Sequence, residues 1–202
     1  KNDIKTIPLA TFAEILENTS NDITEFSILP VENSLEGSVG ESYDLLYSTN
    51  LNVTGETYHR IEHCLIGFGK IEEIDTVYSH PQALGQCRNF IEKNAMKTIP
   101  TYDTAGSVKI IQELNKKNYA CIASKAAASI YNMPIIAENI ANNLNNYTRF
   151  LILSKNEILE TGNDKTSIIF SIKHEPGSLY RIIENFNKNN INLTKIESRP
   201  TK

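Results

Sequence analysis

The chain of 202 residues is long enough for one large domain or two smaller ones, and its 40% hydrophobic and 22% charged residues are typical of a globular protein. Its net charge of -4 and its scattered Lys and Arg residues exclude a nucleic-acid partner, because phosphate binding requires a basic stripe. The 3 cysteines form no Cys-x-x-Cys pair, which argues against disulfides and zinc and fits a reducing cytoplasm. No apolar run approaches the roughly 20 residues of a membrane span.

The first third of the chain predicts a mixture of helices and strands. Thr11, with Glu14 three positions later, has the spacing of a capping box that opens a helix. Pro30 indicates that a buried strand ends there. Residues 52–68 alternate over an unusual length, so we expect one long strand that crosses between two lobes. The other elements expected here are a strand at 5–9, the helix through Leu16, the strand at 26–31 and a helix at 43–47.

Two histidines fall within the long alternating segment. His59 and His63 have the spacing of metal ligands on a helix. The strand pattern and the lack of a nearby carboxylate pattern favour ordinary core or surface histidines instead. We therefore expect no metal.

From residue 74 onward, strand and helix patterns alternate, which predicts a parallel sheet with helices on its faces. The turns after the strands meet at one edge of such a sheet, where sites are commonly placed. They carry Ser79-His80-Pro81-Gln82, Asp103-Thr104-Ala105 and Ser124, although each alone is also what helix capping produces. The expected strands are 74–78, 97–102, 119–123 and 134–136, and the expected helices are 82–93, 104–114 and 125–130.

Two polar segments lie outside this repeat. An Asn-rich loop leads through Asn146 into Tyr147-Thr148-Arg149-Phe150, which places a hydroxyl, a guanidinium and a ring at the start of a strand. The loop at 32–41 contains Asn33 and Ser34, which are good helix caps. That loop either binds an anion at a helix start or is simply a capped turn.

The end of the chain predicts a small separate unit. A polar linker follows Lys155 and runs through Asn163. A strand at 166–173, a helix at 179–187 and a strand at 191–198 then form a β-α-β unit. Because this unit is too small to bury its own core, we expect a partner chain or further sequence to complete it.

Three motifs taken together resemble the prephenate dehydratase family: Val31-Glu32-Asn33-Ser34 with Gly37, Ser79-His80-Pro81-Gln82-Ala83-Leu84 followed by Gln86-Cys87, and Asn146-Tyr147-Thr148-Arg149-Phe150. In the tail, Pro176-Gly177-Ser178-Leu179 and Glu197-Ser198-Arg199-Pro200 resemble the two phenylalanine-binding motifs of the ACT regulatory domain of such enzymes. The family's first strand and Gly-Pro-x-Gly-Thr turn have no counterpart here, and the ACT pattern stops after its second strand. Asp103 and Ser178 also differ from the residues that the family usually has.

The resemblance implies an α/β fold. It places a two-lobed catalytic domain, similar to type II periplasmic binding proteins, at 1–157 and an incomplete ferredoxin-like α+β ACT domain at 164–202. It implies conversion of prephenate to phenylpyruvate in phenylalanine biosynthesis, without cofactor or metal, by a cytoplasmic homodimer or homotetramer that L-phenylalanine inhibits. The alternatives are dehydration of arogenate, and a non-catalytic protein that binds a small carboxylate in the same cleft.

The residues of the site are carried over from the motifs. Thr148 is expected to donate a hydrogen bond to the departing hydroxyl, with a proton relayed from water or Glu32. Arg149 is expected to hold the pyruvyl end of the substrate or, because strand alternation turns it away from Thr148, to brace the site. The catalytic set is Thr148, Asn33, Glu32, Ser79 and Gln86; the substrate-binding set is Ser34, His80, Gln82, Thr104, Arg149 and Phe150; the phenylalanine-binding set is Gly177, Ser178, Leu179, Glu197, Ser198, Arg199 and Pro200.

Overall fold

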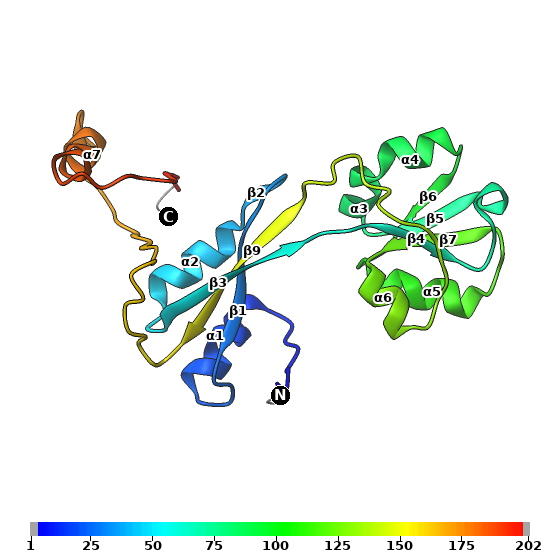
Figure 1. The fold of residues 1–202 in the computed structure, drawn as a ribbon, viewed down its shortest axis with the longest axis horizontal. Helices are drawn as coiled ribbons and strands as arrows, with labels where there is room; N and C mark the ends of the chain where they lie inside the picture. The colour runs from blue at the N-terminus through cyan, green and yellow to red at the C-terminus, as the bar shows by residue number, and fades with distance from the viewer. Residues whose placement is uncertain (1–3, 200–202) are drawn as a thin grey trace. The chain divides into compact units, whose positions relative to one another are not determined.

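The computed structural model describes residues 4–199, which form two compact units, one ending at Ile158 and the other beginning at Leu159 (Figure 1). The first unit contains a four-stranded sheet in the order β2-β1-β9-β3 and a five-stranded sheet in the order β6-β5-β7-β4-β8. We call the four-stranded sheet with helices α1 and α2 the first lobe, and the five-stranded sheet with helices α3 to α6 the second lobe. The expected two-lobed α/β architecture is confirmed.

The first lobe is antiparallel throughout. Its elements are α1 (Phe12–Ser20), β1 (Ser27–Asn33), β2 (Gly37–Ser38), α2 (Gly40–Ser48), β3 (Asn52–Arg60) and β9 (Tyr147–Ser154). The predicted cap of α1 is confirmed, because Thr11 Oγ1 accepts a hydrogen bond from the Glu14 N–H at 3.2 Å. The helix runs on to Ser20, beyond the end expected at Leu16. Leucines of both helices pack on Leu29, Val31, Leu151 and Leu153 to form the core.

Two expectations for the first lobe are wrong. The segment 5–9 has no regular structure, because it is mostly exposed and lies outside both ladders. The strand β1 does not end at Pro30 but continues to Asn33. A shift of register between Pro30 and Glu32 marks a bulge, where a residue without an N–H can be accommodated. Beyond the bulge, Glu32 pairs with Arg149 and Asn33 pairs with Thr148.

The second lobe has a mixed sheet. Its strands are β4 (Cys64–Gly67), β5 (Thr76–Ser79), β6 (Lys97–Pro100), β7 (Tyr119–Ala123) and β8 (Ile135–Ala137). Strand β5 pairs in parallel with β6 and β7, as predicted, whereas β4 is antiparallel to both β7 and β8. The departure from a purely parallel sheet arises because β4 enters directly from the first lobe and not through a helical crossover.

Helices cover the second sheet, and a separate core cluster forms on each side of it. They are α3 (Pro81–Gln86), α4 (Arg88–Lys93), α5 (Gly106–Leu114) and α6 (Lys125–Ile130), with a 3₁₀ turn η1 (Ile71–Glu73) before β5. The single helix expected at 82–93 is divided at the fully buried Cys87, which ends α3 and precedes α4. Among the described residues, the helices all fall short of the length and apolarity that crossing a bilayer requires.

The two lobes are joined by two stretches of chain. Strand β3 ends at Arg60 in the first sheet and β4 begins at Cys64 in the second, so the predicted crossing is confirmed, although the long strand is interrupted at 61–63 (Figure 1). The return segment at 138–146 runs beside it. The Ile61 N–H donates to the Asn146 carbonyl at 2.8 Å, and the Ile140 N–H donates to the His63 carbonyl at 3.1 Å.

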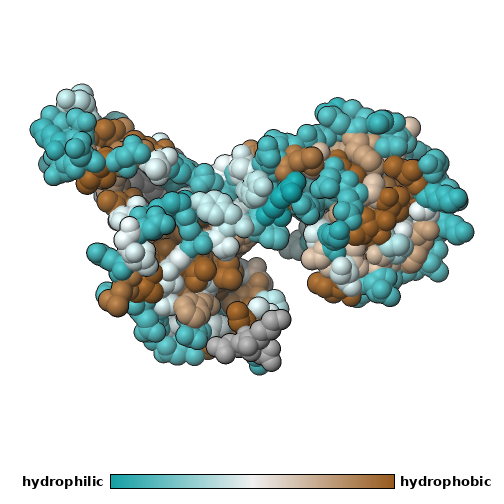
Figure 2. All heavy atoms as spheres, viewed as in Figure 1, coloured by the Kyte–Doolittle hydropathy of each residue, from teal (hydrophilic) through white to brown (hydrophobic). Residues whose placement is uncertain are grey.

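The second unit contains helix α7 (Ser178–Lys188), close to the helix expected at 179–187. The strands expected at 166–173 and 191–198 are wrong, since neither segment pairs with another strand in the described part of the chain. A unit this small buries little apolar surface, and Ile168, Phe170, Leu179 and Ile191 are exposed. Figure 2 shows hydrophobic side chains at the surface beside α7.

Candidate active site

A cavity of about 510 Å³ opens beside the two crossing segments of the first unit. Its walls come from the ends of β1 and β3, the start of β9, residues 61–63, helix α3, the turn before α5 and the start of α6. The structure therefore brings residues from both lobes and both crossings to one place. Five residues predicted for the site line it: Asn33, Gln82, Gln86, Thr104 and Thr148.

Thr148 is held by the amide of Asn33. Asn33 Nδ2 donates to Thr148 Oγ1 at 3.1 Å and to Asn146 Oδ1 at 2.8 Å. Asn33 Oδ1 accepts from the N–H groups of Leu35 and Glu36, both at 3.0 Å, which fixes the orientation of the amide. Because the Thr148 oxygen accepts a hydrogen bond from Asn33, the hydroxyl can donate its own hydrogen to a molecule in the cavity.

Gln86 joins the two lobes across the cavity. Its Oε1 accepts from Asn146 Nδ2 at 3.2 Å and lies 2.8 Å from His63 Nε2, while its Nε2 donates to Glu36 Oε1 at 3.2 Å. An amide oxygen only accepts, so His63 carries a hydrogen on Nε2. His63 is 6% exposed, and its Nδ1 has no hydrogen-bond partner among the described residues.

Arg149 occupies the opposite face of β9 from Thr148, as alternation along a strand requires. Its Nε and Nη2 lie 2.8 and 2.7 Å from Glu56 Oε2, and its Nη1 lies 3.7 Å from Glu32 Oε2. Burial acts to lower the pKa of Arg149, but the hydrogen bond and charge of Glu56 outweigh it, so the pKa is raised. Glu32 and Arg149 thus lie together and away from Thr148, an arrangement that favours bracing over substrate contact.

Four further predicted residues do not line the cavity. Ser34 exchanges hydrogen bonds with the backbone around the start of β9. Ser79 is fully buried and donates to a backbone carbonyl of β7 at 2.7 Å. His80 Nδ1 caps α3 by accepting the N–H two residues later at 3.2 Å. Phe150 is half-buried in β9.

The cavity also contains residues that are not among the predicted site residues. Asn146 bridges Asn33 and Gln86, and His59 pairs directly with Thr148 across β3 and β9. Arg60 and Lys125 supply positive charge. Lys125 directly follows the predicted turn residue Ser124, and no local signal in the sequence marks its charge as part of a site. Among residues 4–199, no group of three or more His, Cys, Asp or Glu side chains is arranged to hold a metal ion.

The residues predicted to bind phenylalanine lie in the second unit. Gly177 has a φ of +84° and precedes α7, which Ser178 and Leu179 open. The Ser178 hydroxyl lies 3.0 Å from the guanidinium of Arg181. Glu197, Ser198 and Arg199 belong to the final described segment, whereas Pro200 lies outside the described residues.

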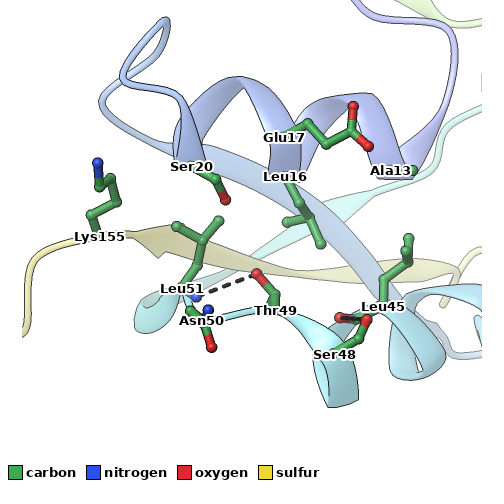
Figure 3. A pocket seen from close by; sticks show the side chains of 10 residues that line it. All are labelled: Ala13, Leu16, Glu17, Ser20, Leu45, Ser48, Thr49, Asn50, Leu51 and Lys155. Atoms are coloured by element: carbon green, nitrogen blue, oxygen red, sulfur yellow. Dashed lines mark hydrogen bonds between the residues drawn. The ribbon is translucent and has the colours of Figure 1, made fainter.

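A second hollow, of about 550 Å³, lies between α1 and the end of α2 (Figure 3). Leu16 and Leu51 reach into it from opposite sides, and Glu17 and Lys155 supply its charges. Lys155 Nζ lies 2.6 Å from Asp22 Oδ2. The described residues that line this hollow include none that was predicted for the site.

Comparison with known proteins places these features in a family. Residues 1–158 match the model of the family described as prephenate dehydratase. The chain is 42% identical to the prephenate dehydratase of Methanocaldococcus jannaschii, with 94% of this chain and 70% of that protein covered. It is 41% identical to arogenate dehydratase 2 of Petunia hybrida, with 96% of this chain and 50% of that protein covered.

A solved structure shares the fold. The prephenate dehydratase of Arthrobacter aurescens in complex with L-Phe has a TM-score of 0.82 and 26% identity, with 96% of this chain and 67% of that chain covered. The chain spans about half the length of the first curated relatives that it matches.

Proposed function

Because this chain belongs to the prephenate dehydratase family, we propose that it converts prephenate to phenylpyruvate. The observation that carries the proposal is the Thr148 hydroxyl, which Asn33 orients at 3.1 Å at the wall of the cavity. A protein that only binds a small carboxylate requires positive charge but not an oriented hydroxyl donor. The motif residues Asn33, Gln86 and Thr148 meet in one network, which supports a reaction at this place.

The reaction is a coupled loss of carbon dioxide and water. The bond between the ring and its carboxylate breaks, and that electron pair forms a new ring double bond as carbon dioxide departs. The shift of electrons through the ring breaks the bond to the hydroxyl on the opposite side. The hydroxyl leaves with its bonding pair and takes up one proton, so the products are phenylpyruvate, carbon dioxide and water. A fixed donor at the departing oxygen supplies ~3 kcal/mol of transition-state stabilisation.

We assign each residue of the site a separate role in this reaction. Thr148 donates to the departing hydroxyl, and because an alcohol is a weak acid, we assign the proton itself to water. Asn33 positions Thr148, and Gln86 holds the two lobes around the substrate. Glu32 lies 3.7 Å from Arg149, so we assign it to fixing that arginine and not to the relay.

An assay for phenylpyruvate formation from prephenate tests the proposal. We expect turnover without nucleotide and in the presence of a chelator. Activity that chelator abolishes and a divalent ion restores would contradict the cofactor-free reaction. Binding of prephenate without any turnover by folded protein would favour the binding-protein alternative.

Arogenate dehydration is the second candidate function, and the likeness to a plant arogenate dehydratase favours it. Arogenate carries an amino group where prephenate carries a keto group, so both fit the same chemistry at the ring. Parallel assays with the two substrates decide between them by the ratio of kcat/KM values.

We also propose that the second unit is the first part of an ACT domain through which L-phenylalanine regulates a cytoplasmic homodimer or homotetramer. The L-Phe complex of the Arthrobacter aurescens protein supports this assignment. Gly177 lacks a side chain at the start of α7, which lets backbone N–H groups approach a carboxylate. The exposed apolar residues beside α7 offer a surface that a second copy can cover.

Calorimetric titration of phenylalanine tests the regulatory site. We expect Gly177→Val to weaken binding by about tenfold or more, because binding depends on close backbone approach. Gly162→Val is the matched control, since Gly162 also has a positive φ, of +81°, but lies in the linker. Unchanged affinity in Gly177→Val, or competition between phenylalanine and a prephenate analogue for the cavity, would place the ligand elsewhere.

A further inference from the structure

The distribution of positive charge in the cavity is not the one that the motifs imply. The substrate of the proposed reaction carries two carboxylates, yet Arg149 is turned to Glu56 and Glu32. Among the residues that line the cavity, the lysine and arginine side chains are Arg60 and Lys125. Arg60 ends β3 in the first lobe and Lys125 begins α6 in the second, so each lobe contributes one cation.

In the described part of the chain, one carboxylate, that of Glu62, lines the cavity together with the two cations. Arg60 Nη1 lies 3.2 Å from Glu62 Oε1. The pKa of Lys125 is raised mainly by its hydrogen bond to Glu138 and by the charge of Glu138, with a smaller contribution from the charge of Glu62. We call these three residues the Arg60–Glu62–Lys125 cluster. The Glu62 carboxylate therefore interacts with one cation from each lobe, directly with Arg60 and more weakly with Lys125.

The contacts that the cluster makes now are weak enough to be exchanged. The side chains of Arg60 and Glu62 are 43% and 41% exposed, and those of Lys125 and its partner Glu138 are 59% and 48% exposed. Exposed ion pairs of this kind contribute little to stability, because solvent screens the charges and fixing two long side chains costs entropy. A guanidinium has five N–H donors and an ammonium has three, so each cation can bind a second carboxylate.

Only one of the two substrate carboxylates is suited to this cluster. Holding the ring carboxylate would stabilise the charge that must leave as carbon dioxide, which slows the reaction. Holding the side-chain carboxylate contributes equally to the ground state and the transition state. The apolar side chains of Ala83, Ala105 and Ala126 also line the cavity and provide surroundings in which the ring carboxylate is not stabilised.

We propose that the Arg60–Glu62–Lys125 cluster binds the side-chain end of the substrate and makes the enzyme prefer prephenate to arogenate. The inference rests on the proposed function and deepens it by assigning substrate choice to named residues. In prephenate the neighbouring keto oxygen accepts a hydrogen bond from a cation. In arogenate the neighbouring ammonium repels the two cations and is attracted to Glu62. Among the described residues, two cations and one carboxylate line the cavity, and Glu138, the exposed partner of Lys125, does not line it, so the cluster favours the keto acid.

Two substitutions of opposite expected sign test the proposal. Lys125→Met should raise the KM for prephenate by about tenfold and leave kcat within about twofold. The reason is that it removes an interaction made equally in the ground state and the transition state. Glu62→Gln should lower the KM for prephenate, which is the opposite of the change expected for Lys125→Met. It should also raise the KM for arogenate. Improved prephenate binding cannot result from misfolding. Lys109→Met is the matched control, since Lys109 is also an exposed helix lysine paired with a glutamate, Glu113, but does not line the cavity.

The experiment separates failure of the inference from failure of the proposed function. If the wild type converts prephenate but Lys125→Met and Glu62→Gln leave the prephenate-to-arogenate ratio of kcat/KM within about twofold, the cluster does not select the substrate. If the wild type converts neither substrate, the proposed function fails. Calorimetric titration of both compounds into Thr148→Val then decides the inference alone. A ratio of prephenate affinity to arogenate affinity that falls with Lys125→Met in this background supports the cluster, and an unchanged ratio overturns it.

Discussion

The first unit contains two hollows of similar size, about 510 Å³ for the cavity beside the crossings and about 550 Å³ for the hollow between α1 and α2. Their walls differ. The described residues that line the hollow come only from parts of the first lobe and the residue that follows β9, and their side chains include leucines and the charged residues Glu17 and Lys155. None of them belongs to the three motifs of the catalytic domain. The cavity is lined by both lobes and contains a hydrogen-bonded network of side-chain amides around Thr148.

Volume alone therefore does not mark a site. The hollow is closed on the inside by Leu16 and Leu51, which belong to the core of the first lobe, so its residues serve stability. The cavity instead fixes the orientation of polar groups that the fold does not need for its core. Fixed donors aimed at a reacting atom are what catalysis requires. Substitutions in the two places should therefore affect different quantities.

The largest effect on turnover is expected at Thr148. Thr148→Val keeps the shape of the side chain but removes the donor to the departing hydroxyl, so kcat should fall by about 100-fold or more with little change in KM. Thr148→Ser, which keeps a hydroxyl, should retain more activity. Steady-state kinetics with prephenate measure both variants. A large rise in KM with kcat preserved would mean that Thr148 only binds.

A smaller effect on turnover is expected from the residue that orients Thr148. Asn33→Asp keeps the oxygen that accepts from the backbone of the following turn but replaces the donor to Thr148, so kcat should fall by about tenfold. Asn50→Asp is the matched change in the hollow and should leave kcat within about twofold. Equal losses in the two variants would remove the distinction between the two places.

The core of the hollow should respond in stability and not in turnover. Leu16 is 5% exposed and packs in the core of the first lobe, so Leu16→Ala should lower the free energy of unfolding by about 2–4 kcal/mol. Its kcat/KM, measured at a temperature at which the variant remains folded, should match the wild type. Urea unfolding and kinetics on the same preparation provide the two numbers. A loss of kcat/KM in folded Leu16→Ala would connect the hollow to the reaction.

The smallest effect concerns alkaline pH. Burial raises the pKa of Cys121 to about 12, whereas a thiol in the unfolded chain has a pKa of about 8.5. The unfolded state therefore loses its proton first, so this contribution to stability is complete below about pH 8.5 and declines as pH rises toward 12. Between pH 8 and 10, stability should fall more steeply in the wild type than in Cys121→Ala. Urea unfolding at both pH values measures the slopes, and equal slopes would contradict a buried neutral thiol.

Local signals in the sequence predicted local structure well. The expected strand 119–123 and helix 125–130 have the same bounds as β7 and α6, because a short apolar strand is followed at once by a capping serine. Ser124 Oγ accepts from the Ala127 N–H at 3.1 Å. The bulge after Pro30 and the antiparallel pairing of β4 were missed because they depend on strands distant in the chain.

The same contrast between local and long-range signals applies to the candidate site. Motif resemblance brought Asn33, Gln86 and Thr148 together, and the structure places them around one cavity. The partner of Arg149 was left open, since alternation gives the face of a strand residue but not what lies there. Glu56, its partner, is 93 positions away in the chain. The charges of Arg60 and Lys125 were overlooked because no local pattern marks them as members of one cavity.

The two crossing segments also determine when the site forms during folding. The contact between Asn33 and Asn146 joins residues 113 positions apart, and the contact between Gln86 and Asn146 joins residues 60 positions apart. Contacts of such long range form late, because the loop they close must first lose its conformational entropy. The second lobe can form from its own continuous stretch of chain, but the sheet of the first lobe needs β9, whose pairing with β1 closes this same long loop and brings the amides to Thr148. During refolding, helical signal should therefore return before enzymatic activity, and the delay between them measures how slowly β9 joins the sheet of the first lobe.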